Sequence, residues 1–223
     1  MTQLFTDLKE FKLCLNTLLE EDGLLNKRHY KLHKNYNNIL SKIESINNEN
    51  NYELIGNSTK TDSDYVYIYF TNNTNFLSKT NKTKNARIYE IKKTIKDLYK
   101  IHENINVNIV IILTRFFKMN TEILEKKLVE KLHIRHIQIF MYNYLLFNIT
   151  KHKYVPRHIR IISNKDEIKA IFIKKNIVNG SLAKILLKDP LANFYGLKVG
   201  DLVEFKRPNN NGGIYIYYRL CSA

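Results

Sequence analysis

Prolines and glycines are concentrated in one stretch near the C-terminus, DPLANFYGLKVGDLVEFKRPNNNGGIYIYYRL, residues 189–220. This stretch holds two of the three prolines and four of the seven glycines of the 223-residue chain. Proline fixes φ and glycine admits positive φ, so together they restrict the backbone strongly. The pattern therefore predicts a segment whose backbone conformation is closely specified.

Turn and capping residues divide this stretch into a helical turn and a hairpin. Asp189 is expected to cap a short helix that has Pro190 at its first position and Gly196, with positive φ, at its end. Gly200 closes a turn into the strand LVEFKR, and Pro208 ends that strand before the turn NNNGG. In the return strand, alternation places Tyr215, Tyr217 and Arg219 on one face, and Ile214, Ile216, Tyr218 and Leu220 on a face expected to join the core.

Hydrophobic periodicity predicts the remaining elements. The expected helices span 4–22 (ended by Gly23), 27–46, 87–103 and 166–178, the last opened by a capping box at Ser163 and ended by Gly180. Another helix is capped by Asn120 or Thr121. Strands are expected at 65–70, 107–113 and 136–142, with one short strand in the polar stretch after residue 46. This order predicts an α/β domain over 1–145, with a mixed sheet flanked by helices, and a small α+β domain over 146–223.

The chain is strongly basic, with 36 Lys and Arg against 21 Asp and Glu and a formal net charge of +15. Such a surplus favours nucleic acid or an acidic protein face as the partner. AT-rich codons, which encode Lys, Asn, Ile and Tyr, account for part of it. Cys14 and Cys221 form no disulfide framework or zinc-ligand spacing, and neither a secretory signal nor a membrane-spanning apolar run is evident. A soluble intracellular protein without membrane partners is expected.

Two histidines and a serine–lysine pair resemble known chemical motifs. His29 and His33 have the four-residue spacing of zinc ligands on a helix, but they lack the intervening glutamate and lie among lysines and an arginine. Ser181 and Lys184 match the S-x-x-K pattern of acyl-transfer enzymes, but the companion motifs are absent. Histidines on a surface helix and a polar loop explain these residues more simply.

A metal-dependent nuclease is the remaining catalytic alternative. Asp62 and Asp64 with Glu90 and Lys92 form a carboxylate–carboxylate–lysine set if they converge in space. An acidic pair before a strand is more often a solvated loop, and Glu90 and Lys92 fall at an expected helix start. The basic run KTNKTK, 79–84, is another candidate for phosphate contact. We expect no catalytic or metal-binding residue and no small-molecule substrate.

Two blocks of the chain resemble a known family. FNITKHKYVPRH, 147–158, and the 189–220 stretch are similar to signature blocks of the fifth subunit common to eukaryotic RNA polymerases I, II and III, whose C-terminal domain corresponds to a small subunit of the archaeal polymerase. Residues 1–145 match this family only in their pattern of elements. The resemblance implies a non-catalytic subunit, with an N-terminal jaw domain beside downstream duplex DNA and a C-terminal assembly domain docked on the largest subunit.

The resemblance also implies where partners bind. The N-terminal jaw is expected to contact DNA without sequence preference through Lys118, Asn120 and Thr121. No cofactor is expected in this subunit, because Mg²⁺ belongs to the catalytic subunits. The closely specified backbone would present a preformed docking surface to the largest subunit. The residues of that surface are expected to be Asp189, Pro190, Tyr195, Gly196, Gly200, Arg207, Pro208, Tyr215, Tyr217 and Arg219.

Several positions depart from the family pattern. The family's Leu-Pro-Arg-Ile is here Leu182-Ala183-Lys184-Ile185, and Val199 and Ile214 each replace an arginine. Asn193-Phe194 replaces a basic residue before Tyr-Gly, and Glu122 replaces the proline of the jaw loop. These changes predict a diverged largest subunit and fit a large DNA virus or an AT-rich protist, so the expected location is the nucleus, or the virion or viral factory. A freestanding basic nucleic-acid-binding protein remains the alternative.

Overall fold

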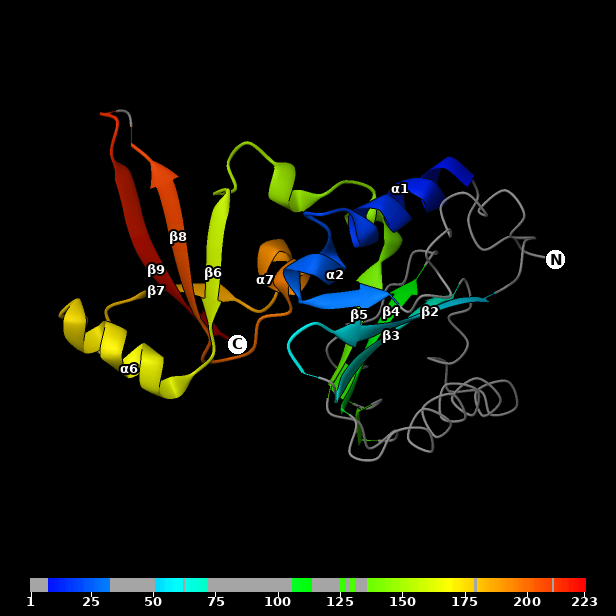
Figure 1. Cartoon of the computed structure of the whole chain (residues 1–223), viewed down its shortest axis with the longest axis horizontal. Helices are drawn as coiled ribbons and strands as arrows, with labels where there is room; N and C mark the ends of the chain where they lie inside the picture. Colours follow the sequence, from blue (N-terminus) through cyan, green and yellow to red (C-terminus); the bar gives the residue numbers. More distant parts are fainter. Residues whose placement is uncertain are drawn as a thin grey trace. The chain divides into compact units, whose positions relative to one another are not determined.

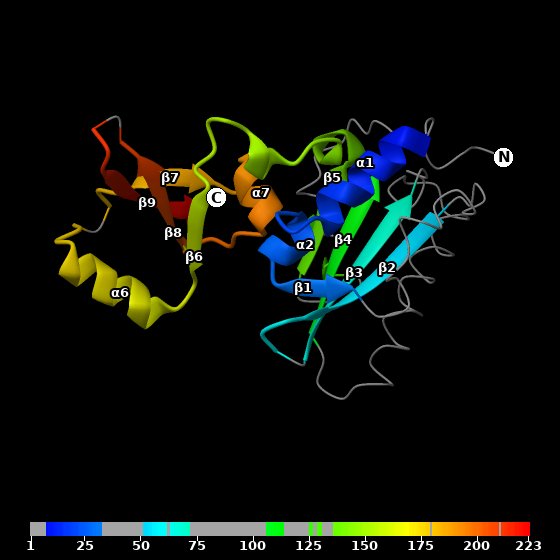
Figure 2. The same ribbon diagram turned by 45° about the horizontal axis from the view of Figure 1, so that its top comes forward.

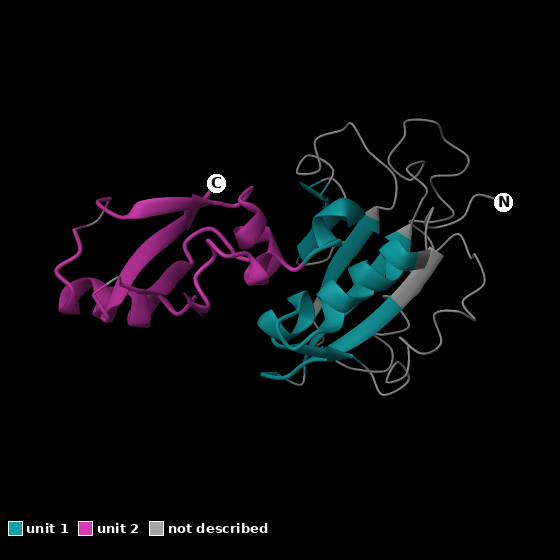
Figure 3. Cartoon of the chain, turned by 90° about the horizontal axis from the view of Figure 1, so that it is seen from above, with its two compact units in different colours: residues 1–147 teal, residues 148–223 magenta. Residues whose placement is uncertain are grey.

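The computed structural model describes residues 8–32, 51–61, 63–71, 106–113, 125–126, 129–130, 136–178, 180–209 and 211–223. The chain divides into two compact units, residues 1–147 and 148–223 (Figure 3). The sequence patterns placed the boundary between residues 145 and 146. Both units combine helices with a mixed sheet, which confirms the predicted fold class.

A five-stranded sheet with strand order β1-β2-β3-β4-β5 forms the centre of the first unit (Figure 2). Its strands are β1 Tyr30–Leu32, β2 Asn51–Ser58, β3 Asp64–Thr71, β4 Asn106–Leu113 and β5 His136–Met141. The first three strands pair antiparallel, whereas β3, β4 and β5 pair parallel. The strands expected at 65–70, 107–113 and 136–142 are therefore confirmed, and the short strand in the preceding polar stretch is β2.

Strand β3 is buried along almost its whole length. All six residues from Tyr65 to Phe70 are buried, as expected for a strand covered on both faces. On one face, Phe11 of α1 (Leu8–Leu19) meets Phe70 edge-on, with ring centroids 5.6 Å apart. On the other face, the rings of Tyr67 and Tyr69 stack at 6.2 Å.

The segment after α1 differs from the prediction. The helix expected over 4–22 ends already at Leu19, and Gly23, with φ −78°, is the N-cap residue of the short helix α2, Leu24–Lys27. The helix expected over 27–46 is wrong at Tyr30–Leu32, which form β1, because pairing with β2 overrides local helix propensity. After α2, Arg28 Nη2 donates to Gln138 Oε1 of β5 at 2.6 Å.

We expect Gly23→Ala to destabilise the chain by about 1–3 kcal/mol, the usual cost of overpacking. A Cβ atom at Gly23 would lie 2.7 Å from the Glu20 carbonyl oxygen and 2.8 Å from that of Leu18, so backbone must move. Gly213→Ala is the control, because a Cβ there meets no atom within 4 Å. Equal thermal melting temperatures for the two variants would contradict this account.

A four-stranded sheet with order β6-β8-β9-β7 forms the second unit (Figure 1). Its strands are β6 His158–Ile162, β7 Ala183–Leu186, β8 Leu202–Pro208 and β9 Ile214–Ser222. Strand β8 pairs antiparallel with β6 and β9, and β7 pairs parallel with the end of β9. The short helices η4 Tyr142–Leu145 and η5 Ile149–Lys151 lie on either side of the division between the units.

Helix α6, Lys165–Lys174, begins and ends differently from the expected 166–178 helix. Asn164, not Ser163, is the cap: its side-chain oxygen accepts hydrogen bonds from the backbone N–H groups of Asp166 and Glu167. The helix ends before Gly180, because the chain already turns at Asn176, whose φ is +50°. Asparagine is one of the few residues that tolerates this conformation.

The helix expected at 87–103, the Asn120 or Thr121 cap and the rest of the 27–46 helix lie outside the described residues.

Both cysteines are free and buried, and burial raises the pKa of each thiol. Within the described part of the chain, no helix is both long and apolar enough to span a membrane.

Candidate protein-docking surface

A short capped helix fixes one end of the 189–220 stretch. Asp189 Oδ1 accepts a hydrogen bond from the Leu191 N–H at 2.8 Å, and Pro190 begins helix α7, Pro190–Tyr195. Gly196 ends the helix with φ +66° and ψ +39°. Its N–H donates to the Asn193 carbonyl, and the Leu197 N–H donates to that of Ala192, which is the Schellman pattern. The predicted cap, first helical residue and left-handed glycine are confirmed.

A turn at Gly200 joins this helix to the hairpin. Gly200 lies in the turn that the sequence predicts; its φ is +94°, and its N–H donates to the Cys221 carbonyl at 3.0 Å. The buried Asp201 accepts the Lys198 N–H on its carboxylate at 2.7 Å, and its carbonyl accepts the Cys221 N–H at 2.8 Å. The turn is thereby bonded to the end of β9, so its backbone is held from both sides.

Stacked aromatic rings form one face of the hairpin. The ring of Tyr217 lies 5.0 Å from Phe205 and 5.6 Å from Tyr215, nearly parallel to both. The guanidinium carbon of Arg207 lies 5.5 Å from the centre of the Tyr217 ring, a cation–π arrangement. Arg207 also donates from Nη2 to the Tyr154 carbonyl at 3.0 Å. The predicted shared face of Tyr215 and Tyr217 is confirmed, and contacts already made within the unit hold it in place.

The opposite face of β9 is not the core that the sequence predicts. Ile214 is 71% exposed and Ile216 is 41% exposed, whereas Tyr218 and Leu220 are half-buried. This half of β9 lies at the end of the hairpin, where its partners on β8, from Lys206 to Pro208, are not buried either. The first half of β9 therefore presents apolar side chains on both faces.

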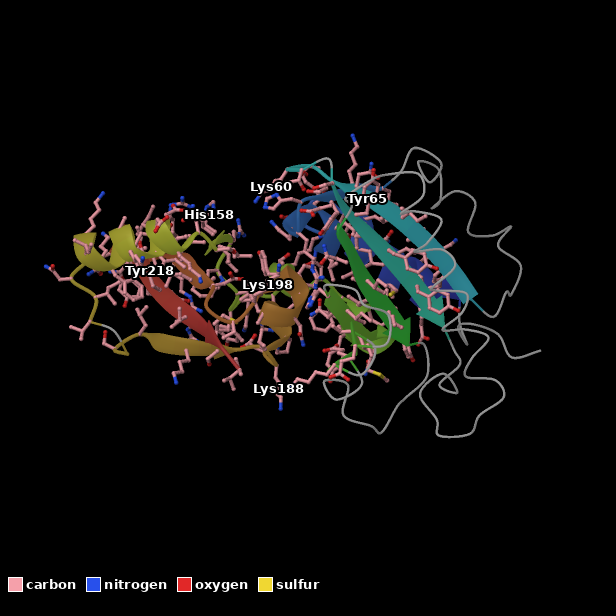
Figure 4. The ribbon with its side chains drawn as sticks, turned by 90° about the horizontal axis from the view of Figure 1, so that it is seen from below. Lys60, Tyr65, His158, Lys188, Lys198 and Tyr218 are labelled. Carbon is pink, nitrogen blue, oxygen red and sulfur yellow. The ribbon has the colours of Figure 1, made fainter. Side chains whose placement is uncertain are left out.

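Tyr218 anchors a polar contact on that opposite face. Its hydroxyl donates to Glu204 Oε2 at 2.8 Å, and Lys206 Nζ lies 3.5 Å from Glu204 Oε1. Burial, together with the hydrogen bond to Glu204, raises the pKa of Tyr218 to about 12. Figure 4 labels Tyr218 and His158 in this unit.

The raised pKa of Tyr218 predicts a stability difference at high pH. A hydroxyl with a higher pKa in the folded state stabilises the fold fully below its unfolded pKa near 10. That contribution is lost as pH rises through about 12. Urea titrations should therefore show the wild type losing stability between about pH 10 and 12 more steeply than Tyr218→Phe, and parallel profiles would contradict the coupling.

A shallow hollow lies between β9 and the chain that precedes β7. Lys175, Ile177, Leu182 and Ala183 line one side, and Arg207 and the β9 residues from Tyr215 to Arg219 line the other. The lining is aromatic, aliphatic and basic, and no acidic side chain belongs to it among the described residues. This composition suits a protein segment more than a small polar substrate.

The structure groups some of the predicted docking residues and sets others apart. Arg207, Tyr215, Tyr217 and Arg219 line the same hollow. Tyr195 is instead buried, with its ring 6.1 Å from Phe194, so its side chain packs within the unit and exposes little surface. Asp189, Pro190, Gly196, Gly200 and Pro208 determine the path of the backbone.

Of the alternative catalytic sets, only Ser181 with Lys184 lies wholly within the described residues. The Ser181 hydroxyl donates a hydrogen bond to the Val178 carbonyl at 2.7 Å, so it stabilises a local turn. Asp64 accepts from the Thr61 hydroxyl at 2.7 Å. In the described ranges, no three His, Cys, Asp or Glu side chains gather as metal ligands. Asp62, Glu90, Lys92, His33, the 79–84 run and the expected DNA contacts Lys118, Asn120 and Thr121 lie outside these ranges.

Two contributors to the surface were not predicted from the sequence. Tyr154 is 70% exposed, lies 4.7 Å from Lys153 Nζ and offers its carbonyl to Arg207. Glu204 is buried and holds Tyr218. The pairing of Glu204 with Tyr218 depends on the register of β8 and β9, which the sequence does not show. Tyr154 and Arg207 are 53 residues apart, and no local sequence pattern connects them.

Charge is unevenly distributed between the units. Residues 148–223 contain fourteen Lys and Arg against five Asp and Glu, a formal net charge of +9 within the total of +15. Two of the five acids, Asp201 and Glu204, are buried. The second unit is therefore of the class of small α+β domains that present a preformed, basic and aromatic surface.

Comparisons with known proteins agree with that class. The family model for the C-terminal domain of RNA polymerase Rpb5 matches residues 147–221. The DNA-directed RNA polymerase subunit Rpo5 of Pyrococcus abyssi is 43% identical over 74 residues, covering 33% of this chain and 88% of that protein. The chain belongs to the RNA polymerase Rpb5 family, and residues 147–221 carry the match.

Eukaryotic relatives match over a smaller share of their length. The Dictyostelium discoideum subunit rpabc1 of DNA-directed RNA polymerases I, II and III is 40% identical over 77 residues, which are 34% of this chain and 38% of that protein. The Caenorhabditis briggsae subunit RPABC1 is 32% identical over 84 residues, which are 38% of this chain and 39% of that protein. The matched region thus spans about two fifths of these relatives.

Proposed function

We propose that this chain is a non-catalytic structural subunit of a multisubunit DNA-directed RNA polymerase. In this proposal the second unit docks on the largest subunit, and the first unit forms part of the jaw that holds downstream DNA. The polymerase names of the relatives that match residues 147–221 support the first statement. The second statement rests on the family resemblance of the sequence.

The preformed aromatic and basic surface on β8 and β9 is the observation that carries the docking role. Tyrosine and arginine dominate the energetics of protein interfaces, and Tyr215, Tyr217, Arg207 and Arg219 lie together here. Ring stacking and the Schellman turn already fix this surface in the free chain. Binding a partner therefore costs little conformational entropy, because few groups of this chain have to become ordered.

Affinity purification of the tagged full chain tests this function. The expected result is co-purification of a largest polymerase subunit with other polymerase subunits. Mg²⁺-dependent synthesis should then belong to the complex, and the isolated chain should lack it. A chain that recovers only nucleic acid would favour the freestanding binding protein, for which the charge of the second unit is the supporting observation.

The cofactor and location follow from the same proposal. The subunit itself needs no cofactor, and Mg²⁺ is held by the catalytic subunits. A cellular polymerase places the chain in the nucleus, whereas a viral polymerase places it in the virion or the viral factory.

The jaw role predicts a salt effect. Lys118→Ala is expected to reduce the slope of log affinity against log salt by about one for the assembled polymerase on downstream duplex, because one phosphate contact is lost. The change should be the same for unrelated duplex sequences, since phosphate contacts carry no base information. An unchanged slope would place the DNA contact elsewhere, with the 79–84 run as the next candidate.

A further inference from the structure

One edge of strand β9 has no strand beside it over the first half of its length. Strand β7 pairs with Arg219–Ser222 only, so among the described residues nothing continues this pairing along Ile214–Tyr218. The hollow lined by Lys175, Ile177 and Leu182 lies at this edge, where an extension of β7 would run. The residues before β7 do not pair with β9, so one more strand could pair with Ile214–Tyr218 at this edge.

Hydrogen bonds at the end of β9 show which backbone groups face this edge. Cys221 bonds through its N–H to Asp201 and through its carbonyl to Gly200, on the side of β8. The Ser222 carbonyl accepts from Leu187, on the side of β7. Because backbone groups alternate along a strand, Ile216 and Ile214 direct theirs to the same side as Ser222, toward the open edge.

The open edge lacks the features that usually block strand addition. Native proteins protect edges with charged side chains, prolines or bulges. The other outer strand, β6, carries the exposed His158 and Arg160. Ile214–Tyr218 contains no charged residue, and its first three side chains are all exposed. An uncharged, exposed strand edge of this kind is suited to pairing.

Charge around the hollow indicates the chemistry of the strand that pairs. Arg207, Arg219 and Lys175 line it, and no acidic side chain does among the described residues. A strand added here directs alternate side chains to the two faces of the sheet. The face of Tyr215 and Tyr217 also carries Arg207 and Arg219, whereas the face of Ile216 carries Ile214, Tyr218 and Lys206. The matching segment alternates acidic and apolar residues.

We propose that the edge of β9 at Ile214–Tyr218 binds an extended segment of the largest polymerase subunit, with alternating acidic and apolar residues, as an added β-strand. The inference rests on the proposed docking function and names the chemistry of its partner. Backbone pairing supplies affinity in such complexes, and side-chain alternation supplies specificity. Five β9 residues offer an edge of about 16 Å, at roughly 3.3 Å per residue.

Backbone amide exchange on the full chain tests this binding. The probe is a peptide of about ten residues alternating glutamate and valine, and the same peptide with lysine in place of glutamate is its control. The acidic peptide is expected to slow exchange at Ile214 and Ile216 at least tenfold. Tyr215 and Tyr217, whose N–H groups face β8, should change little.

Matched proline variants give a second measurement. Proline removes the N–H that a new strand would use, and edge positions tolerate it. Ile216→Pro is expected to weaken binding of the acidic peptide at least tenfold. Ile159→Pro is the control, because by the same alternation its N–H faces the outer edge of β6. Unchanged melting temperatures show that both variants fold, and the exchange measurement needs no variant.

Three results would overturn the proposal. The first is that the acidic peptide does not slow amide exchange at Ile214 and Ile216. The second is an equal loss of peptide affinity in both proline variants. The third is that amide exchange slows with rising protein concentration in the absence of peptide, which would mean that two copies of the chain pair. If the largest subunit binds while these amides stay unprotected, the docking function stands and this inference falls. If the peptide protects them while no polymerase subunit is recovered, the edge site stands and the function falls.

Discussion

Replacing Tyr217 and Arg219 together by alanine is expected to abolish recovery of the largest polymerase subunit with this chain. Both side chains line the docking hollow, and each is of a type that commonly contributes about 2 kcal/mol or more to an interface. A combined loss of about 4 kcal/mol is a roughly thousandfold weaker complex. Tagged pull-down from the producing cell, followed by subunit identification, measures the effect.

The same variant should remain folded. Arg219 is exposed and Tyr217 is half-buried, so the main internal loss is ring stacking on Phe205 and Tyr215, about 1–3 kcal/mol in all. Circular dichroism melting checks this. Tyr144→Ala with Lys169→Ala is the control, because both side chains are exposed and outside the hollow. Normal recovery of polymerase with the Tyr217 and Arg219 variant would contradict this docking site and make residues 147–158 the next candidate.

Gly196→Val is expected to damage both folding and assembly. Its φ of +66° costs an L-residue about 1–2 kcal/mol, and a β-branched residue more. The Schellman bonds of Gly196 and Leu197 would be lost with that conformation, which releases the buried Phe194 and Leu197 from their packing. We expect a total loss of about 2–4 kcal/mol in the free energy of unfolding, measured by urea titration, together with poor recovery of polymerase.

Gly196→Asn separates backbone strain from the loss of glycine itself. Asparagine visits the left-handed region more readily than valine, so this variant should keep most of the stability and assembly. Equal damage by asparagine and valine would show that space around the glycine, and not its positive φ, is what position 196 requires.

The local geometry of the 189–220 stretch was determined by its sequence. Asp189, Pro190, Gly196 and Gly200 adopt the predicted roles because capping, fixed φ and positive φ are properties of one residue and its neighbours. The alternation of Tyr215, Tyr217 and Arg219 followed for the same reason. Strands β3, β4 and β5 were also predicted as strands, since buried strands are often nearly continuous apolar runs, but their parallel pairing is seen only in the structure.

Other features depended on contacts between distant residues. Tyr30–Leu32 is a strand and not a helix because β2 pairs with it. Ile214 and Ile216 are exposed because they lie at the end of the β8–β9 hairpin, which no described residue covers, and the same half of β9 has an open edge because β7 is short. The alternation of apolar residues in β9 gave no sign of which face, or which edge, another element covers. That depends on how far neighbouring strands extend. The open edge of β9 is therefore a property of the tertiary structure, whereas the aromatic face beside it is a property of the sequence.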